Sequence, residues 1–346
     1  MLDIDGAHGE GGGQLLRTAV ALSAVTGRAL RMRDIRARRK KPGLAAQHLT
    51  AVRAVGALCD ARIEGLALGA RELSFVPGAP RGGEFRFDVG TAGSVTLVLQ
   101  ALVPAMIAGG AACRVLVTGG TDVRAAPPLD YFRAVLLGLL GRMGARLRLA
   151  AHRRGYFPGG GGEVELTVEP GARLRPLAAE SPGRLLELRG AAHVGNLPAH
   201  IAARMREAAL QALGERAAID VAVLGEDGAQ GRGGAVVAWA ETEASVLGAG
   251  EVAERGVPAE TLGARVGAGL RADLAAGASL DVHAADQLLV YLALAGGRSV
   301  FTARTLSSHA RTAIWLIEQF LPVRFSVAPH GALTWVEVRS SGALPT

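Results

Sequence analysis

The sequence predicts an α/β (α+β) fold in which three βαβαββ repeat units form a large body and a small α/β domain is inserted before the third unit. Two observations support this prediction. Three segments of about 70 to 85 residues repeat one order of β-rich runs and apolar runs of helical length. Residues 181–276 break the repeat but alternate strand and helix patterns of their own. We therefore expect the body at residues 1–180 and 277–346 and the inserted domain at residues 181–276.

Each unit begins with a short strand and an apolar helix. The short strands are expected at "LDIDG", "EFRFDVG" and "SLDV", and the helices open from "GEGGG", "GTAGS" and "HAAD". Helix N-termini present unpaired N–H groups and a partial positive charge. Each of the three openings is therefore suited to receive a phosphate.

The second half of each unit is a helix followed by two strands. These helices begin after "KKPGL", "AAPPLD" and "TLSSH". In the last of them, apolar residues recur at helical spacing from Ile314 to Phe320, Ser307 or Ser308 is the expected cap, and His309 falls in the first turn. If the units pack around a pseudo-threefold axis, the helix N-termini would converge on one cleft.

The non-repeating segment is expected to fold in the order β-α-β-β-β-α, from "LLELRGAAHV" to "AETLGARVGAGLRADLAAG". Its elements have apolar faces of their own, which predicts a separate core. The composition of Glu226–Gly234 predicts a mobile turn or loop, and that of Gly155–Leu166 predicts a Gly-rich hairpin.

Composition narrows the class of protein. A net charge of +7 and a pI near 10.3 fit polyanionic partners, and equally fit a solvated surface in an arginine-biased genome. The only lysines, Lys40 and Lys41, do not follow a Gly-rich turn, which excludes a P-loop and argues against nucleotide transfer through lysine. Cys59 and Cys113 lie in apolar segments, which argues against a disulfide framework and fits a reducing compartment. Without a long apolar run or signal-peptide pattern, we expect a soluble cytoplasmic protein with no membrane partner.

The first helix opening, "HGEGGGQLLRTA", surrounds Glu10 with four glycines and adds Arg17. Glycines let a backbone approach a ligand closely. Glu10 could hold a hard metal ion and Arg17 a phosphate. The alternative is a tight turn with a solvated Glu and Arg.

A run of eight basic residues against one acid follows at "RALRMRDIRARRKK". Backbone phosphates of a nucleic acid are its natural partner. Aromatic residues are only 4% of the chain, so backbone contacts should outweigh base stacking. The alternative is a solvated basic edge strand, since Lys and Arg also protect strand edges.

Two further groups have both a structural and a functional interpretation. His283, Asp286 and Gln287 are expected at a strand-to-helix turn, where Asp286 can be a simple N-terminal cap. Gln100 lies in an otherwise apolar helix, where it is either a satisfied core amide or a ligand contact.

His309 is the best candidate nucleophile for phosphorus in this chain. A neutral imidazole is nucleophilic, and an ordinary pKa of about 6.5 leaves it largely neutral at pH 7. A helix N-terminus lowers that pKa and suits an arriving phosphate. The alternative is an ordinary histidine that caps the helix or lies on the surface, as most histidines in the first turn of a helix do.

Taken together, these segments resemble the RNA 3′-terminal phosphate cyclase family. The matching text is "DGAHGEGGGQLLRTAVALS", "IRARRKKPGLAAQHLTAV", "GTAGSVTLVLQALVPA", "GGTDVRAAPPLDYFRAV", "RGYFPGGGGEVEL", "HAADQLLVYLALAGG" and "SSHARTAIWLIEQFLPVRF". The seven segments occur in the family's order over nearly the whole chain, with the insert matching weakly.

The resemblance implies conversion of an RNA 3′-phosphate end into a 2′,3′-cyclic phosphodiester, with ATP and a divalent metal ion, Mg²⁺ or Mn²⁺. A histidine takes AMP from ATP and releases pyrophosphate, the RNA 3′-phosphate accepts the AMP, and the neighbouring 2′-OH then expels it. The resemblance places the histidine at His309, the acidic metal-associated residue at Glu10 and the phosphate-binding arginine at Arg17. It also places ATP-contacting residues at Gln100, His283, Ala284, Ala285, Asp286 and Gln287, while the basic residues Arg36, Arg38, Arg39, Lys40 and Lys41 suit the RNA end.

Two alternatives share this style of fold. A non-catalytic RNA-binding assembly factor would lack the helix histidine and parts of the Gly-rich elements, whereas His309, Glu10 and Arg17 are all present here. Enolpyruvyl transferases need six units, and this chain shows three. The sequence leaves a homodimer open.

Overall fold

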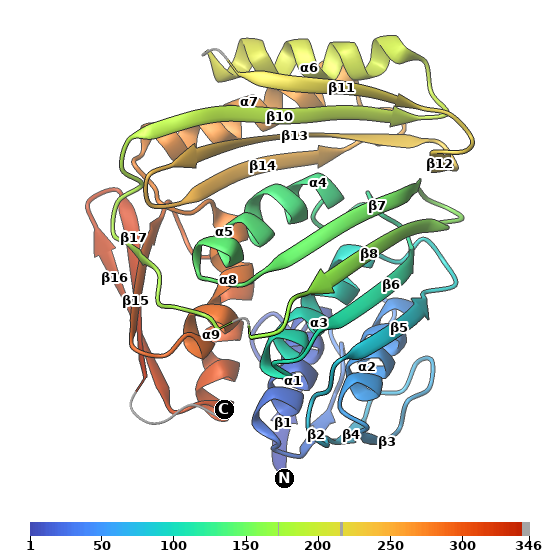
Figure 1. Cartoon of the computed structure of the whole chain (residues 1–346), viewed down its shortest axis with the longest axis vertical. Helices are drawn as coiled ribbons and strands as arrows, with labels where there is room; N and C mark the ends of the chain where they lie inside the picture. Colours follow the sequence, from blue (N-terminus) through green and yellow to red (C-terminus); the bar gives the residue numbers. More distant parts are fainter. Residues whose placement is uncertain (172, 215–216, 341–346) are drawn as a thin grey trace.

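The computed structural model describes residues 1–171, 173–214 and 217–340, and confirms a mixed α/β fold (Figure 1). Its strands form four sheets. Three lie in the lower part of the molecule in Figure 1 and the fourth, with two long helices, lies across the top.

The first sheet has the order β1-β2-β4-β3. β1 and β2 are parallel, and the other neighbours are antiparallel. Helices α1 and α2 connect the strands. The bounds are β1 Leu2–Asp5, α1 Gly13–Thr26, β2 Leu30–Arg33, α2 Ala46–Leu58, β3 Arg62–Glu64 and β4 Leu73–Val76.

The second sheet has the corresponding order β5-β6-β8-β7, with the two-residue strand β12 (Ala229–Gln230) added beside β7. Its second helix is divided into α4, a π-helical segment η1 and α5. β7 and β8 form the predicted Gly-rich hairpin. The bounds are β5 Gly83–Asp88, α3 Val95–Ala108, β6 Cys113–Gly119, α4 Leu129–Tyr131, η1 Phe132–Leu136, α5 Leu137–Arg142, β7 Leu147–Gly155 and β8 Gly162–Val168.

The third sheet has the order β9-β15-β17-β16, and its first strand corrects the sequence prediction. "SLDV" is not a strand, because Asp281 accepts hydrogen bonds from the N–H groups of His283 and Ala284 and so starts a helix at Val282. β9, which precedes the insert in sequence, pairs with β15 in its place. The bounds are β9 Ala178–Ala179, α8 Val282–Leu294, β15 Arg298–Ala303, α9 Ser308–Phe320, β16 Val323–His330 and β17 Leu333–Ser340.

The fourth sheet belongs to the predicted inserted segment and has the order β11-β10-β13-β14. α6 and α7 lie side by side against it and close a hydrophobic cluster separate from the main core (Figure 1). The bounds are β10 Leu185–Gly195, α6 Ala199–Leu213, β11 Ala218–Leu224, β13 Gly233–Thr242, β14 Val246–Val252 and α7 Ala259–Ala275.

The segment Glu226–Gly234, predicted as a mobile turn or loop, has a turn at residues 226–228, which a short strand follows. Ala229–Gln230 forms β12, which pairs in parallel with Arg154 and Gly155 of β7. The Arg154 N–H also donates to the Gly228 carbonyl at 2.9 Å. Backbone hydrogen bonds therefore join the insert to the second sheet.

Within the described residues, no helix is long and apolar enough to span a membrane.

Candidate active site

A cleft of about 670 Å³ lies where helix N-termini of the body approach the inserted segment. It brings together nine of the predicted site residues. They are Glu10, Arg17, Arg36, Arg39, Gln100, His283, Asp286, Gln287 and His309.

His309 occupies the first turn of α9, as predicted. Ser307 is the N-cap, and its hydroxyl oxygen accepts a hydrogen bond from the Ala310 N–H at 3.0 Å. The same hydroxyl donates to Asp286 at 2.7 Å. Asp286 lies inside α8, and through this hydrogen bond it orients the cap of α9. The interpretation of Asp286 as the cap of its own helix is therefore wrong, because Asp281 has that role.

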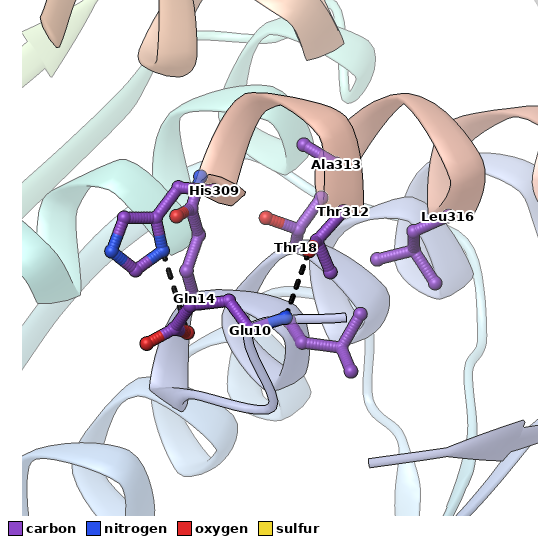
Figure 2. Close-up of a pocket in the computed structure, with 8 residues that line it drawn as sticks. Glu10, Gln14, Thr18, His309, Thr312, Ala313 and Leu316 are labelled. Carbon is purple, nitrogen blue, oxygen red and sulfur yellow. Dashed lines mark hydrogen bonds and ion pairs between the residues drawn. The ribbon is translucent and has the colours of Figure 1, made fainter. Parts of the chain in front are cut away.

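Glu10 lies opposite His309 (Figure 2). The Glu10 Oε2 atom is 3.4 Å from Nδ1 of His309, and the carboxylate is ion-paired with Arg39. The Glu10 N–H donates to Thr312 Oγ1 at 3.1 Å, and that hydroxyl donates to the Ser308 carbonyl. The N-terminal loop is thus fixed to the turn that carries the histidine.

The two ring nitrogens of His309 have different surroundings. Nδ1 is buried, faces Glu10, and has no hydrogen-bond partner in the described part of the chain. The side chain as a whole is 43% exposed, which leaves Nε2 for the cleft. Burial lowers the pKa of His309; the Asp286 carboxylate opposes this and the charges of Arg39 and Arg17 add to it. The imidazole is therefore held neutral.

Arg17 is the buried cation of the site. It is 8% exposed, and burial, reinforced by the charge of Arg36, lowers its pKa to about 10. Arg36 donates to the Gly43 carbonyl at 2.6 Å. A buried guanidinium without a carboxylate partner strongly favours an anion as its ligand.

Gln100 and Gln287 meet across the helix interface. The Gln100 side-chain amide donates to Gln287 Oε1 at 2.9 Å, so one hydrogen bond joins helices α3 and α8 at the cleft wall. Nearby, the His283 ring packs edge-on against Tyr131, with ring centroids 6.4 Å apart. These contacts form a wall of the cleft that is partly apolar and partly made of side-chain amides, and this wall lies beside the arginines.

The other predicted residues do not line this cleft. The side chains of Ala284 and Ala285 are buried in the main core. Arg38, Lys40 and Lys41 are exposed, with Arg38 donating to the Gly9 carbonyl at 3.3 Å. They lie before α2, which begins at Ala46, close to the predicted start after "KKPGL". Their place at the RNA end stays a prediction.

His48 and Gln47 line the cleft, although neither was among the predicted site residues. His48 Nδ1 accepts a hydrogen bond from the Ala45 N–H, so the other nitrogen carries the proton. That nitrogen is buried and finds no partner among the described residues. Burial and then the charges of Arg17 and Arg36 lower the pKa of His48 to about 3. The sequence signal that could have identified Gln47 and His48 is their position at the start of the second helix.

Residues of the segment between β6 and α4 also line the cleft, and the sequence marked this segment only as the start of a helix and as part of the family resemblance. They are Arg124, Ala125, Ala126, Pro127 and Pro128. They face residues 250–252 and Glu254 of the insert.

The site fits a divalent metal through one protein carboxylate. In the described ranges, no cluster of three or more His, Cys, Asp or Glu side chains could hold a metal ion by itself. Mg²⁺ commonly takes one carboxylate together with water and substrate phosphates. Glu10, 15% exposed and close to three arginines that could hold those phosphates, has the chemistry for this.

Known proteins resemble this chain over nearly its whole length. The model of the family described as RNA 3′-terminal phosphate cyclase matches residues 8–327. The chain belongs to the RNA 3′-terminal phosphate cyclase family. It is 55% identical over 341 residues to the protein of that name from Nitrosospira multiformis, covering 98% of this chain and 97% of that one. It is 44% identical to those from Pyrobaculum neutrophilum, with 98% of both chains covered, and Methanopyrus kandleri, with 99% of both covered.

The cyclase-family match includes every residue of the predicted site, from Glu10 to His309, and the whole inserted sheet.

Proposed function

We propose that this chain is an ATP-dependent RNA 3′-terminal phosphate cyclase that works through a histidine–AMP intermediate. The observation that carries the proposal is the position of His309. It lies in the first turn of a helix, faces a carboxylate through one nitrogen, and reaches a cleft that contains four arginines.

In the first step, Nε2 of His309 attacks the α-phosphorus of ATP. An N–P bond forms, the bond to the bridging oxygen breaks, and pyrophosphate leaves. The Glu10 carboxylate favours the tautomer with the proton on Nδ1, which leaves the Nε2 lone pair free. The N-terminus of α9 favours the arriving negative charge.

Arg17, Arg36 and Arg39 would bind phosphate groups in this step. Arg17 is buried and has no carboxylate partner among the residues that the structure describes, whereas Arg39 would exchange Glu10 for a phosphate. Such charge-assisted contacts both position the phosphates and stabilise charge that develops on them.

Glu10 would hold Mg²⁺ or Mn²⁺. A bound divalent ion offsets the charge of the triphosphate. The His283–Gln287 turn of α8 and Gln100 would contact the rest of the nucleotide, with His283 next to Tyr131.

In the later steps, an oxygen of the RNA 3′-phosphate attacks the phosphorus of the His309–AMP bond and frees the imidazole. The neighbouring 2′-OH then attacks the activated 3′-phosphorus, closes the cyclic diester and releases AMP. The exposed run from Arg38 to Lys41, beside the cleft residues Arg36 and Arg39, suits the RNA backbone.

Incubation with α-labelled ATP and a divalent metal tests the first step. The protein should acquire an acid-labile label, and His309→Ala should acquire none. A label that persists in His309→Ala would show that another residue carries the nucleotide.

An oligonucleotide ending in a 3′-phosphate separates the enzyme from an RNA-binding assembly factor. An enzyme renders the end resistant to phosphatase in an ATP-dependent manner. An assembly factor binds the oligonucleotide and leaves the end sensitive.

A further inference from the structure

Four charged or titratable side chains are buried at the junction between the second sheet and the insert, apart from the residues assigned above. They are Asp122, Asp130, Arg154 and His193, here called the clip. The side chains of the two aspartates and of His193 are at most 4% exposed, and that of Arg154 is 12% exposed. Burying this much charge is costly unless the groups compensate one another.

The clip closes the segment that runs from β6 to α4. Asp122 Oδ1 accepts a hydrogen bond from the Leu129 N–H at 3.1 Å, which joins the two ends of the segment. Arg154 then bridges both ends, donating to Asp122 at 3.1 Å and to both oxygens of Asp130 at 2.9 Å. One guanidinium therefore sets the separation of the two carboxylates.

The closed segment is a wall of the nucleotide cleft. Residues 124–128 line the cleft, and the Pro127 carbonyl accepts a hydrogen bond from Thr96 of α3 at 2.9 Å. Ala125 has a φ of +59°, a left-handed conformation that costs an alanine free energy and persists only when its surroundings hold it. The ends that the clip joins are the main fixed points of this wall.

His193 brings the insert into the clip. It lies on β10, with Nε2 3.5 Å from Asp122 and Nδ1 3.5 Å from Asp130. These distances exceed those of good hydrogen bonds, so the contact is chiefly electrostatic. The Tyr156 ring stacks beside it, and Arg133 pairs with Asp130 from outside. Burial alone would lower the pKa of His193, but the charge of Asp122 and contacts with both carboxylates outweigh it and raise the pKa.

We infer that Arg154 and His193 are positioning residues, and that through them the inserted domain fixes the 124–128 wall and so sets the affinity for the nucleotide. The second half of this inference rests on the proposed function. If the clip were only a structural ion-pair cluster, it would stabilise the fold without a specific effect on that wall. Hydrogen exchange and ATP kinetics distinguish this role from a positioning role.

The first readout is amide hydrogen exchange of the full chain without nucleotide. His193→Phe keeps a ring but removes both the charge and the N–H groups, and His193→Gln keeps an amide donor. The Leu129 amide should exchange about tenfold faster in His193→Phe than in the wild type, because the buried hydrogen bond from its N–H to Asp122 is weakened. In His193→Gln the increase in the exchange rate should be smaller. The control is Met205→Ala, which opens a cavity in the insert's own core. At a comparable loss in Tm it should leave Leu129 protected.

The second readout is the KM for ATP against kcat in self-adenylylation. His193→Phe should raise KM about five- to tenfold with kcat within about twofold, because the pre-formed wall is lost while His309 is untouched. The inference is overturned if Leu129 protection is unchanged in His193→Phe, if KM stays constant, or if Met205→Ala reproduces both changes. Because exchange is measured without nucleotide, a wild-type chain that never adenylylates would refute the proposed function and leave the exchange result to decide the clip.

Discussion

The two nitrogens of His309 determine how its reactivity should depend on pH. In the proposed mechanism the neutral ring is the nucleophile, and burial together with Arg39 and Arg17 lowers its pKa below 6.5 against the opposing charge of Asp286. Since protonation is shifted to lower pH, the rate of adenylylation should be level from pH 7 to 8, and its acid limb should lie below pH 6.5. Single-turnover labelling across pH 4.5–8 checks this. An acid limb centred above pH 6.5 would contradict it.

Glu10 has two expected roles at the residue scale, and one substitution tests both. Glu10→Gln keeps the shape but removes the charge that faces His309 and would hold the metal. We expect adenylylation to fall about 10²- to 10⁴-fold, the usual range for a group that acts on proton placement and charge together. The measurement is the rate as a function of metal concentration.

Asp3→Asn is the matched control for Glu10→Gln. Asp3 is a surface carboxylate that pairs with Arg33 on the first sheet. Its rate should equal that of the wild type. If Glu10→Gln also keeps the wild-type rate and metal dependence, Glu10 does not have the roles proposed for it.

At the scale of the element, the start of α1 tests how closely the site is packed. A Cβ on Gly13 would overlap His48 Nε2 and lie 3.0 Å from Arg17. His48 is buried and held by the Ala45 N–H, so it has little room to yield. We expect Gly13→Ala to destabilise the fold by about 1–3 kcal/mol and to weaken ATP binding, because overpacking moves both side chains. Thermal unfolding and ATP titration measure the two effects.

Gly141→Ala in α5 is the control for this substitution, because nothing lies within 4 Å of its Cβ position. There the helix propensity of alanine acts alone, and stability should rise by about 0.5–1 kcal/mol. Stabilisation by both variants would show that the start of α1 is less tightly packed than the structure indicates.

The elements themselves could largely be predicted from the sequence where a periodic pattern met a clear boundary. α6, α7, β10 and β13 are such cases. "SLDV" failed because its composition suits a strand while Asp281 caps a helix, and the two outcomes compete over only three residues. β12 failed for a different reason: a two-residue strand is determined by its partner β7 and carries no pattern of its own.

The site could be predicted only from the segments taken together. His309, Glu10 and Arg17 each had an ordinary alternative in the sequence, and the order of the seven family segments favoured the functional interpretation. The structure brings the three residues to one cleft. The contribution of Arg124 and Pro127 to the cleft could not be predicted residue by residue, because their place depends on Asp122 and on Arg154, which lies on β7 after an intervening helix. Lys40 and Lys41 are the opposite case. Their charge stood out in the sequence, but their side chains do not line the cleft.

For the whole molecule, the clip predicts how stability depends on pH. His193 has a raised pKa, so its contribution is complete below pH 6.5 and is lost as pH rises through the higher folded-state value. Burial alone would raise the pKa values of Asp122 and Asp130, but Arg154 and His193 outweigh it and lower them. The contribution of the carboxylates is therefore present above about pH 4 and lost in stronger acid.

Urea unfolding between pH 5.5 and 9 checks the alkaline side of this prediction. The wild type should lose stability above pH 6.5, and His193→Gln should show a smaller loss over the same interval. Equal slopes in the two proteins would mean that His193 is not charged between the carboxylates.

The placement of β9 has a consequence for the order in which the chain assembles during synthesis. Ala178–Ala179 leaves the ribosome before the insert, yet its partner Val300–Phe301 follows about 120 residues later. The third sheet cannot close until the insert and α8 have been made, and the entropy lost in closing so long a loop is smaller if the insert has already folded. We therefore expect the insert to act as a folded spacer that brings the two ends of its host sheet together, and the body to be completed last.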